Sequence, residues 1–110
     1  MNEQFADRFE KYVAGVVQKV QTDYATNYPN LTPPSVEVSE GGRYMKVYKA
    51  EYGKDGKVIS RSVHSFIDRT SGDVLKPETW SRPAKWARGN IYDADNGLSR
   101  VSSYGPAYLR

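Results

Sequence analysis

The first quarter of the chain carries the pattern that most restricts its fold. Apolar side chains recur at intervals of three and four residues through positions 3–26, a period that predicts one amphipathic helix. The apolar stripe consists of Phe5, Phe9, Val13, Val16, Val20 and Tyr24. Asn2 is suited to cap the N-terminus of this helix. A helix with one apolar stripe must bury it, and because the stripe ends without further heptads, a sheet is a better partner than a coiled coil.

Residues 43–69 predict that sheet. They read RYMKVYKAEY, then GKDG, then KVISRSVHSFIDR, and the pair Asp55-Gly56 is a strong signal for a hairpin turn. A second turn leads into residues 74–76, which adds a third antiparallel strand. A short strand at residues 36–38 would add a fourth. The chain is therefore expected to form an antiparallel meander.

Two registers of the hairpin are open, and they place its aromatic residues on opposite faces. The residues concerned are Tyr44, Tyr48 and Tyr52. A two-residue turn pairs them with Ile67, Val63 and Ile59 on the core face. A three-residue loop, residues 54–56, instead turns them outward with His64 and Phe66, and puts Met45 and Val47 in the core. Gly56 suits the left-handed third position of the longer loop, so we favour the second register. It offers an aromatic strip to the bases of single-stranded nucleic acid.

Residues 76–92, KPETWSRPAKWARGNIY, hold both tryptophans and four basic side chains. Ser81 can cap a helix, Pro83 is tolerated in a first turn, and Gly89 suits the residue after a last turn. These signals predict a short helix over residues 82–88. On it, one face would carry a basic stripe with an aromatic neighbour, formed by Arg82, Lys85, Arg88 and Trp86. The stripe suits phosphate contacts; the plainer interpretation is that both tryptophans close the core and the charges are solvated.

The charge distribution supports the first interpretation. The net charge is +3, and residues 76–110 carry six basic and three acidic side chains, whereas residues 1–30 carry three and four. Basic and aromatic residues together predict a nucleic-acid-binding surface for which a single strand is the favoured ligand. The predicted surface consists of Lys76, Arg82, Lys85, Trp86, Arg88, Tyr44, Tyr48 and Tyr52. The alternative is a protein-interaction module: an inhibitor of a host or defence factor, or an oligomeric virion component.

Catalytic and cofactor signatures are missing from the sequence. The chain has no cysteine and one histidine, His64, which excludes thiolate chemistry and disfavours a histidine-based metal site. No phosphate-binding or dinucleotide fingerprint occurs. Residues 93–97 begin like a calcium loop, but Tyr104 stands where a bidentate glutamate is needed, so a plain turn is expected. We predict a non-enzymatic protein without metal or cofactor. No signal peptide or membrane-spanning run is evident, which favours a cytoplasmic location.

Several residues in the second half of the chain resemble a group of small uncharacterised proteins of tailed bacteriophages and environmental viral sequences. The resemblance covers about residues 62–110. It is carried by Thr79-Trp80, Pro83-Ala84-Lys85 and Arg88-Gly89-Asn90-Ile91, preceded by Asp68, Gly72-Asp73 and Lys76. It implies a viral origin and the cytoplasm of an infected bacterium, and it brings no function with it.

The expected architecture is a single α+β domain over residues 1–110. The N-terminal helix packs on a three- to four-stranded antiparallel meander, and a short C-terminal helix and an irregular tail close one end. Helix, three strands and a second helix in this order also fit the topology of a double-stranded RNA-binding domain.

Overall fold

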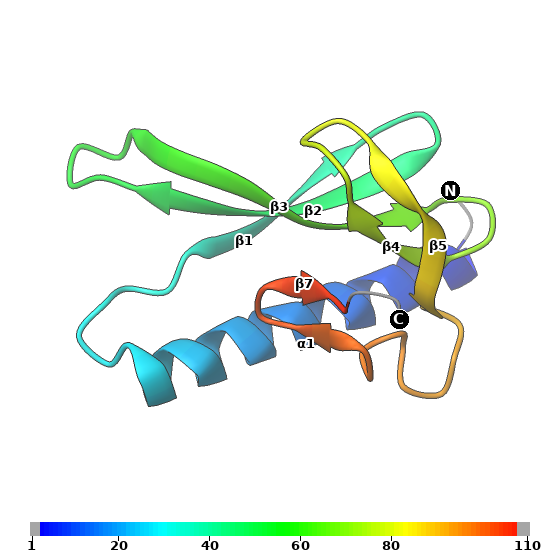
Figure 1. Ribbon diagram of the computed structural model, residues 1–110, viewed down its shortest axis with the longest axis horizontal. Helices are drawn as coiled ribbons and strands as arrows, with labels where there is room; N and C mark the ends of the chain where they lie inside the picture. The colour runs from blue at the N-terminus through cyan, green and yellow to red at the C-terminus, as the bar shows by residue number, and fades with distance from the viewer. Residues whose placement is uncertain (1–2, 108–110) are drawn as a thin grey trace.

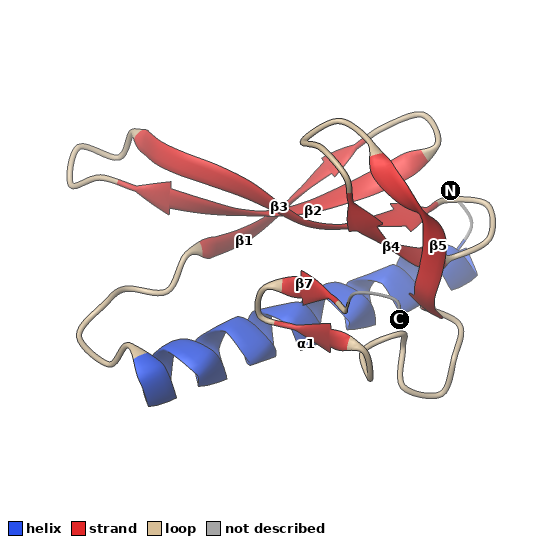
Figure 2. Ribbon diagram, viewed as in Figure 1, coloured by secondary structure: helices blue, strands red, loops and turns tan. Residues whose placement is uncertain are grey.

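The computed structural model describes residues 3–107, in which one helix lies across one face of an antiparallel sheet (Figure 1). The expected α+β architecture is therefore confirmed. The helix is α1 (Glu3–Asn27). Five strands form the sheet in chain order, β1 (Ser35–Glu40), β2 (Tyr44–Tyr52), β3 (Val58–Asp68), β4 (Asp73–Pro77) and β5 (Pro83–Asn90). A separate small hairpin is made by β6 (Val101–Ser102) and β7 (Gly105–Pro106). Figure 2 shows the helix and the sheet as separate layers.

The helix buries the predicted stripe against the sheet. Its buried residues are Phe5, Phe9, Tyr12, Val16 and Val20. Val13 and Tyr24 pack against the same core while partly exposed. Tyr12, which the stripe analysis left out, is fully buried and stands one helical turn after Phe9. Asn2, the expected cap, lies outside the described residues.

The hairpin tip has the predicted three-residue loop. The N–H of Gly53 donates to the carbonyl of Lys57 at 2.9 Å, and Gly56 takes the left-handed φ of 79° that the longer loop requires. Further along, two β-bulges shift the pairing, between Glu51 and Tyr52 and again between Val47 and Tyr48. A bulge adds one unpaired residue to one strand and so resets which side chains face the core.

The bulges explain which register predictions failed. Met45 and Val47 are buried in the core, as the longer loop implied. Ile59 was placed on the core face but is 70% exposed. His64 was placed on the opposite face with Phe66, but it is the extra residue of the second bulge and is fully buried. Neither simple register describes the whole hairpin.

The segment predicted as a helix over residues 82–88 is a strand, and that prediction was wrong. β5 pairs antiparallel with β4, with Pro83 opposite Pro77. Neither proline can donate to the ladder, and β5 is an edge strand, where proline is tolerated. Gly89 does not end a helix; a Cβ there would lie 3.2 Å from the carbonyl oxygen of Gly97, so close packing explains the glycine. With no helix after the strands in residues 3–107, the double-stranded RNA-binding topology is also wrong.

The tail returns beneath the sheet and covers the side of α1. Ile91 and Val101 join the core, and Ser103 donates a hydrogen bond from Oγ to Asp23 of the helix at 2.8 Å. Residues 93–97 form the expected plain turn, in which the Asp95 carboxylate accepts the N–H of Gly97. Tyr92 packs partly against the core, whereas Tyr104 is 68% exposed.

Candidate functional site

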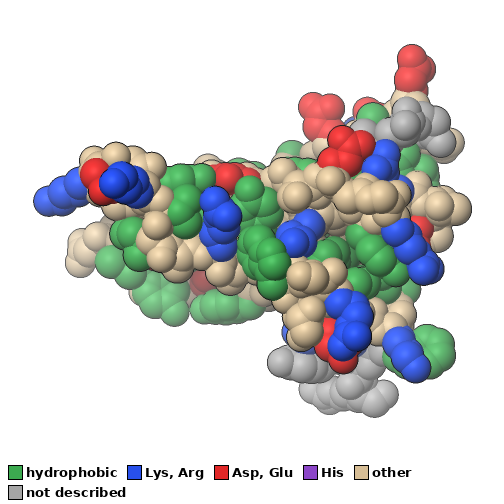
Figure 3. All heavy atoms as spheres, turned by 90° about the horizontal axis from the view of Figure 1, so that it is seen from above, with side chains coloured by type: hydrophobic (Ala, Val, Ile, Leu, Met, Phe, Trp, Pro, Cys, Tyr) green, Lys and Arg blue, Asp and Glu red, His purple; other side chains and the backbone are tan. Residues whose placement is uncertain are grey.

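The sheet has one face on α1 and one face turned away from it. We call the second the outer face; Figure 3 looks onto it and shows Lys and Arg side chains set among hydrophobic ones. Strand alternation places the side chains of Tyr44, Lys46 and Tyr48 of β2 on this face, with Phe66 of β3 beside them. The loop between β4 and β5 folds over it and brings in Trp80.

These five side chains form a cluster, here called the outer cluster: Tyr44, Lys46, Tyr48, Phe66 and Trp80. Tyr48 meets Trp80 edge to face, with ring centroids 5.6 Å apart, and Tyr44 meets Phe66 in the same way at 6.0 Å. The Lys46 ammonium lies between the two pairs, 4.1 Å from the Trp80 ring centroid and 5.9 Å from that of Phe66. Edge-to-face rings and a cation over their faces are mutually favourable. The cluster thus holds a half-buried positive charge among aromatic rings, of which Phe66 is buried and Trp80 is exposed.

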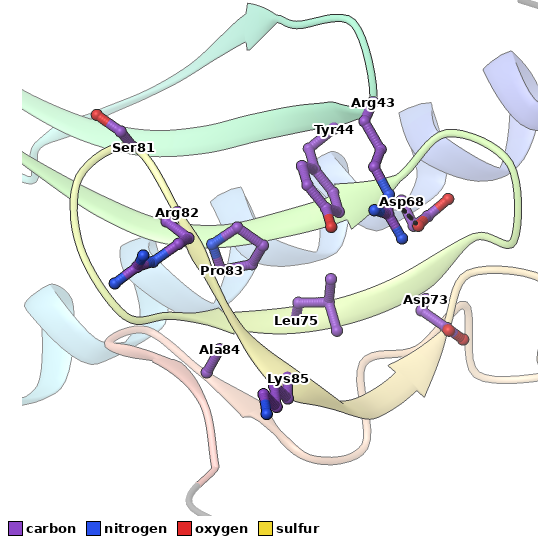
Figure 4. Close-up of a pocket in the computed structure, with 10 residues that line it drawn as sticks. All are labelled: Arg43, Tyr44, Asp68, Asp73, Leu75, Ser81, Arg82, Pro83, Ala84 and Lys85. Carbon is purple, nitrogen blue, oxygen red and sulfur yellow. Dashed lines mark ion pairs between the residues drawn. The ribbon is translucent and has the colours of Figure 1, made fainter.

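Two adjoining hollows flank the outer cluster. The larger, of about 450 Å³, lies over β4 and β5, and the smaller, of about 270 Å³, lies beside β2. Arg43, Tyr44 and Ser81 line both. Figure 4 shows the larger hollow, with Tyr44 leaning towards Leu75. The basic side chains of Arg82 and Lys85 also line this hollow, as do Asp68 and Asp73.

Positive charge on the outer face is partly balanced by acids. Arg43 lies 3.6 Å from Asp68, the pair drawn in Figure 4, and Arg82 lies 3.3 Å from Glu78. Partial burial opposes ionisation of Asp68, but N–H donors from Ser71 and Thr70, with help from Arg43, lower its pKa below the usual value. Asp68 is therefore an anion at neutral pH. Lys46 and Lys85 form no ion pair within residues 3–107.

Part of the predicted binding surface is assembled here. Tyr44, Tyr48, Arg82 and Lys85 lie together on the outer face, around the cluster and the larger hollow. Tyr52 stands further along β2, 46% exposed, and donates a hydrogen bond to Glu37 at 2.6 Å. This bond is the main reason that the pKa of Glu37 is lowered and that of Tyr52 is raised.

The other three predicted residues lie away from the outer cluster and the larger hollow. Arg88 is only 8% exposed and donates from Nε to the carbonyl of Ala107 at 3.3 Å, so it supports the tail. Lys76 donates to the carbonyl of Pro106 in the small hairpin. Trp86 is 70% exposed on the edge strand. The continuous basic stripe that a helix would have made does not exist.

Sequence reasoning missed Arg43, Lys46 and the position of Trp80. Lys46 could have been predicted to share a face with Tyr44 and Tyr48, because it stands two residues from each along one strand. Side chains two residues apart on a strand point to the same face. Arg43 directly precedes that strand, and its guanidinium lies 5.2 Å from the Tyr44 ring centroid. The plainer interpretation of the sequence placed Trp80 in the core. Its loop carries it to the opposite face, a placement that no local signal encodes.

The inner face holds a buried chain of hydrogen bonds. Nε2–H of His64 donates to the carbonyl of Ser102 at 2.9 Å, which leaves Nδ1 to accept from the Ser65 hydroxyl at 2.9 Å. The Tyr12 hydroxyl then donates to Ser65 Oγ at 2.7 Å. Burial lowers the pKa of His64 to about 4 and raises that of Tyr12. The histidine is therefore neutral, and both of its ring nitrogens are engaged by the fold.

The described residues show neither of two other features. Within residues 3–107 no three His, Asp or Glu side chains come together as a metal site. No helix in that range is long and apolar enough to cross a membrane.

Comparison with known proteins gives a family and no function. No curated protein and no solved structure matches the chain. A family model described as "Family of unknown function (DUF7717)" matches residues 1–107, which includes the helix, the whole sheet and the small hairpin. The match begins at residue 1, well before residue 62, where the expected resemblance to viral proteins starts. The chain belongs to this family of unknown function, DUF7717.

Proposed function

We propose that the protein binds single-stranded nucleic acid on its outer face and catalyses no reaction. The observation that carries the proposal is the outer cluster, in which one lysine lies among four aromatic rings; Phe66 is buried beneath the others, Tyr44 and Tyr48 are half-buried, and Trp80 is exposed. Proteins that bind single strands without sequence preference combine aromatic side chains, on which bases stack, with cations that follow the phosphates. Both elements are present within one surface here.

The arrangement of the cations supports the same function. Arg43, Arg82 and Lys85 line the larger hollow beside the aromatic rings, so phosphates could lie in the hollow while bases meet the cluster. Two of these cations already have acidic neighbours, Asp68 and Glu78. A polyanion must compete with those carboxylates. We therefore expect affinity in the range typical of non-specific binding, a Kd of about 10⁻⁴ to 10⁻⁶ M at physiological salt.

The proposed absence of catalysis rests on the burial and hydrogen bonding of His64. It is the chain's one histidine, and it is buried, neutral and hydrogen-bonded at both ring nitrogens. A histidine that acts as a general base needs a ring nitrogen that can reach the proton it removes. His64 has none to offer.

Fluorescence anisotropy with a labelled single-stranded oligonucleotide of about 12 nucleotides tests the proposal. We expect binding at low salt that weakens steeply as salt rises from about 0.05 to 0.2 M, because counterions are released from the strand. The variant Lys46→Ala/Arg82→Ala should bind about 10-fold more weakly, since it loses a stacked cation and a phosphate contact.

The matched control removes the same charge from the helix, as Lys11→Ala/Lys19→Ala. Both lysines belong to α1 on the other side of the molecule. A change within about 2-fold is expected for this control, since only the long-range field is altered. No binding at low salt, or equal losses in the two double variants, would refute the proposal.

A second candidate function, a protein-interaction module, is favoured by Trp86. Its side chain is 70% exposed on the edge strand β5, and tryptophan is enriched where protein interfaces concentrate their binding energy. The partner would be a host or defence factor, a virion component or a second copy of the chain. The setting that the viral resemblance implies is the cytoplasm of an infected bacterium.

The two functions differ in salt dependence and in the residue they need. A protein complex built on Trp86 should withstand high salt and nuclease, and should be lost in Trp86→Ala. Nucleic-acid binding by the outer face should be lost at high salt and should survive Trp86→Ala. Light scattering with and without nuclease, at low and high salt, distinguishes them.

A further inference from the structure

The hairpin of β2 and β3 extends beyond the sheet as a two-stranded arm. β2 pairs with β1 only as far as Ala50, and β3 pairs with β4 only at Phe66 and Ile67. Within the described chain, residues 51–60 form strand pairs only with each other, whereas Arg61 and Ser62 pair with Ala50 and Lys49 at the base of the hairpin; we call residues 51–62 the arm. Figure 1 shows it projecting from the body, in green. Except for Gly53, all its residues are exposed, so little in the fold itself accounts for its length.

The arm combines exposed aliphatic side chains with cations. Ile59, at the bulge near the tip, is 70% exposed, and Val58 beside it is 40% exposed. The cations Lys54, Lys57 and Arg61 form no ion pair within residues 3–107, although Arg61 lies near enough to Glu37 to help lower the pKa of that carboxyl. The arm's acids are Glu51 and Asp55; Asp55 is used in the turn, where it accepts the N–H of Lys57 at 3.0 Å. Such a surface complements a polyanion that also presents apolar groups.

The order of residues along the arm favours a nucleic-acid groove over a membrane surface. A segment that enters a bilayer places its apolar side chains deepest, with cations behind them. Here the tip is Lys54 to Lys57, and the aliphatic residues follow it. A two-stranded ribbon fits the major groove of B-form DNA, which is about 12 Å wide, and an aliphatic side chain there can contact a thymine methyl group. The major groove of an RNA duplex is too deep and narrow.

We propose that the arm enters the major groove of a DNA duplex whose strand continues as a single strand onto the outer face. The ligand is then a junction of double- and single-stranded DNA. β2 connects the two contacts directly, because it runs from the arm through Tyr48 to Tyr44 in the outer cluster. The nine residues of strand from Tyr52 to Tyr44 span about 26 Å, enough to reach from a duplex end into its tail. This inference rests on the proposed function of the outer face.

The test compares three labelled DNAs: a single strand of about 12 nucleotides, a duplex of about 12 base pairs, and the duplex carrying the single strand as a tail. The intact protein should bind the tailed duplex at least about 10-fold more tightly than either part, because two contacts on one ligand raise the effective concentration. The arm variant Lys54→Ala/Lys57→Ala/Ile59→Ser should lose this gain. Its affinity for the single strand should stay within about 2-fold of the parent.

The three DNAs and the arm variant together distinguish a failure of this inference from a failure of the proposed function. Equal binding of the tailed duplex and the single strand would overturn the arm's role and leave the outer face in place. Binding of the duplex alone, with none of the single strand, would overturn the junction and the outer face together. Arm-dependent binding to vesicles of anionic lipid, with the DNA preference unaffected by the arm variant, would also overturn it. Because the altered residues are exposed, circular dichroism should show an unchanged fold.

Discussion

The two faces of the sheet are built by the same strands and use their polar groups in opposite ways. On the inner face, Tyr12, Ser65 and His64 form a closed chain of hydrogen bonds. In the described residues no buried side-chain nitrogen or oxygen lacks a partner. On the outer face, the Lys46 ammonium lies over aromatic rings and makes no ion pair within residues 3–107. The inner face thus stabilises the fold, and in the proposed function the outer face keeps polar groups for its ligand.

The largest difference should appear between the inner face and the exposed arm, when the same substitution is made at two positions of β3. Ile67 is fully buried and Ile59 is 70% exposed. Ile67→Ala should lower the free energy of unfolding by about 2 to 5 kcal/mol, because it leaves a cavity in the core. Ile59→Ala should change it by no more than about 0.5 kcal/mol. Urea unfolding followed by tryptophan fluorescence measures both, and similar losses would contradict the burial of Ile67 and the exposure of Ile59.

Acid should weaken the inner face before it affects the outer one. The pKa of His64 is lowered to about 4 by burial. In the unfolded chain it takes up a proton below about pH 6.5, so the unfolded state binds more protons and stability falls as pH drops from about 6.5 to 4. The free energy of unfolding should fall by about 3 kcal/mol as the pH drops from about 6.5 to 4.

Urea titrations at several pH values measure this loss, with His64→Gln as the control. The variant has no group that titrates at this position, so its stability should change much less between pH 6.5 and 4. Asp68, whose pKa is lowered, contributes at the acid end of the range and should do so equally in both proteins. A parent protein with flat stability across the window would show that the histidine is not buried as described.

A smaller contrast is expected from removing one tyrosine hydroxyl on each face. Tyr12→Phe removes a buried hydroxyl that donates to Ser65. It should lower the free energy of unfolding by about 0.5 to 1.5 kcal/mol. Tyr48→Phe removes a partly exposed hydrogen bond of 3.2 Å to Glu37. Because water can replace this bond, the free energy of unfolding should change little. Thermal unfolding compares the two variants. A greater loss for Tyr48→Phe would reverse the roles of the faces.

Sequence patterns predicted the inner face better than the outer one, because burial imposes periodicity. The period of α1 follows from its need to bury one stripe, and the turn at Asp55-Gly56 requires a glycine with positive φ. Both are local rules, and both were confirmed. The bulge at His64 was not predictable, since its extra residue is accommodated by contacts with Ser102, 38 residues away.

The segment 76–92 shows where local signals mislead. Proline near the start and glycine near the end fit a helix, but they also fit an edge strand with a close backbone approach. Pairing with β4 decided the outcome, and tertiary pairing of this kind overrides propensity. As a result, Arg82 and Lys85 line a hollow on the outer face, while Arg88 is buried against the tail.

Photo-crosslinking tests the central claim, that the outer face holds single-stranded nucleic acid, most directly. The probe is a single strand of about 12 bromouracil nucleotides, and mass spectrometry of the digested complex locates the crosslinks. Crosslinks should fall on Tyr44, Tyr48 and Trp80 of the outer cluster, and should disappear at high salt. Crosslinks confined to the solvent side of α1, or none at a salt concentration where the strand is bound, would contradict the claim.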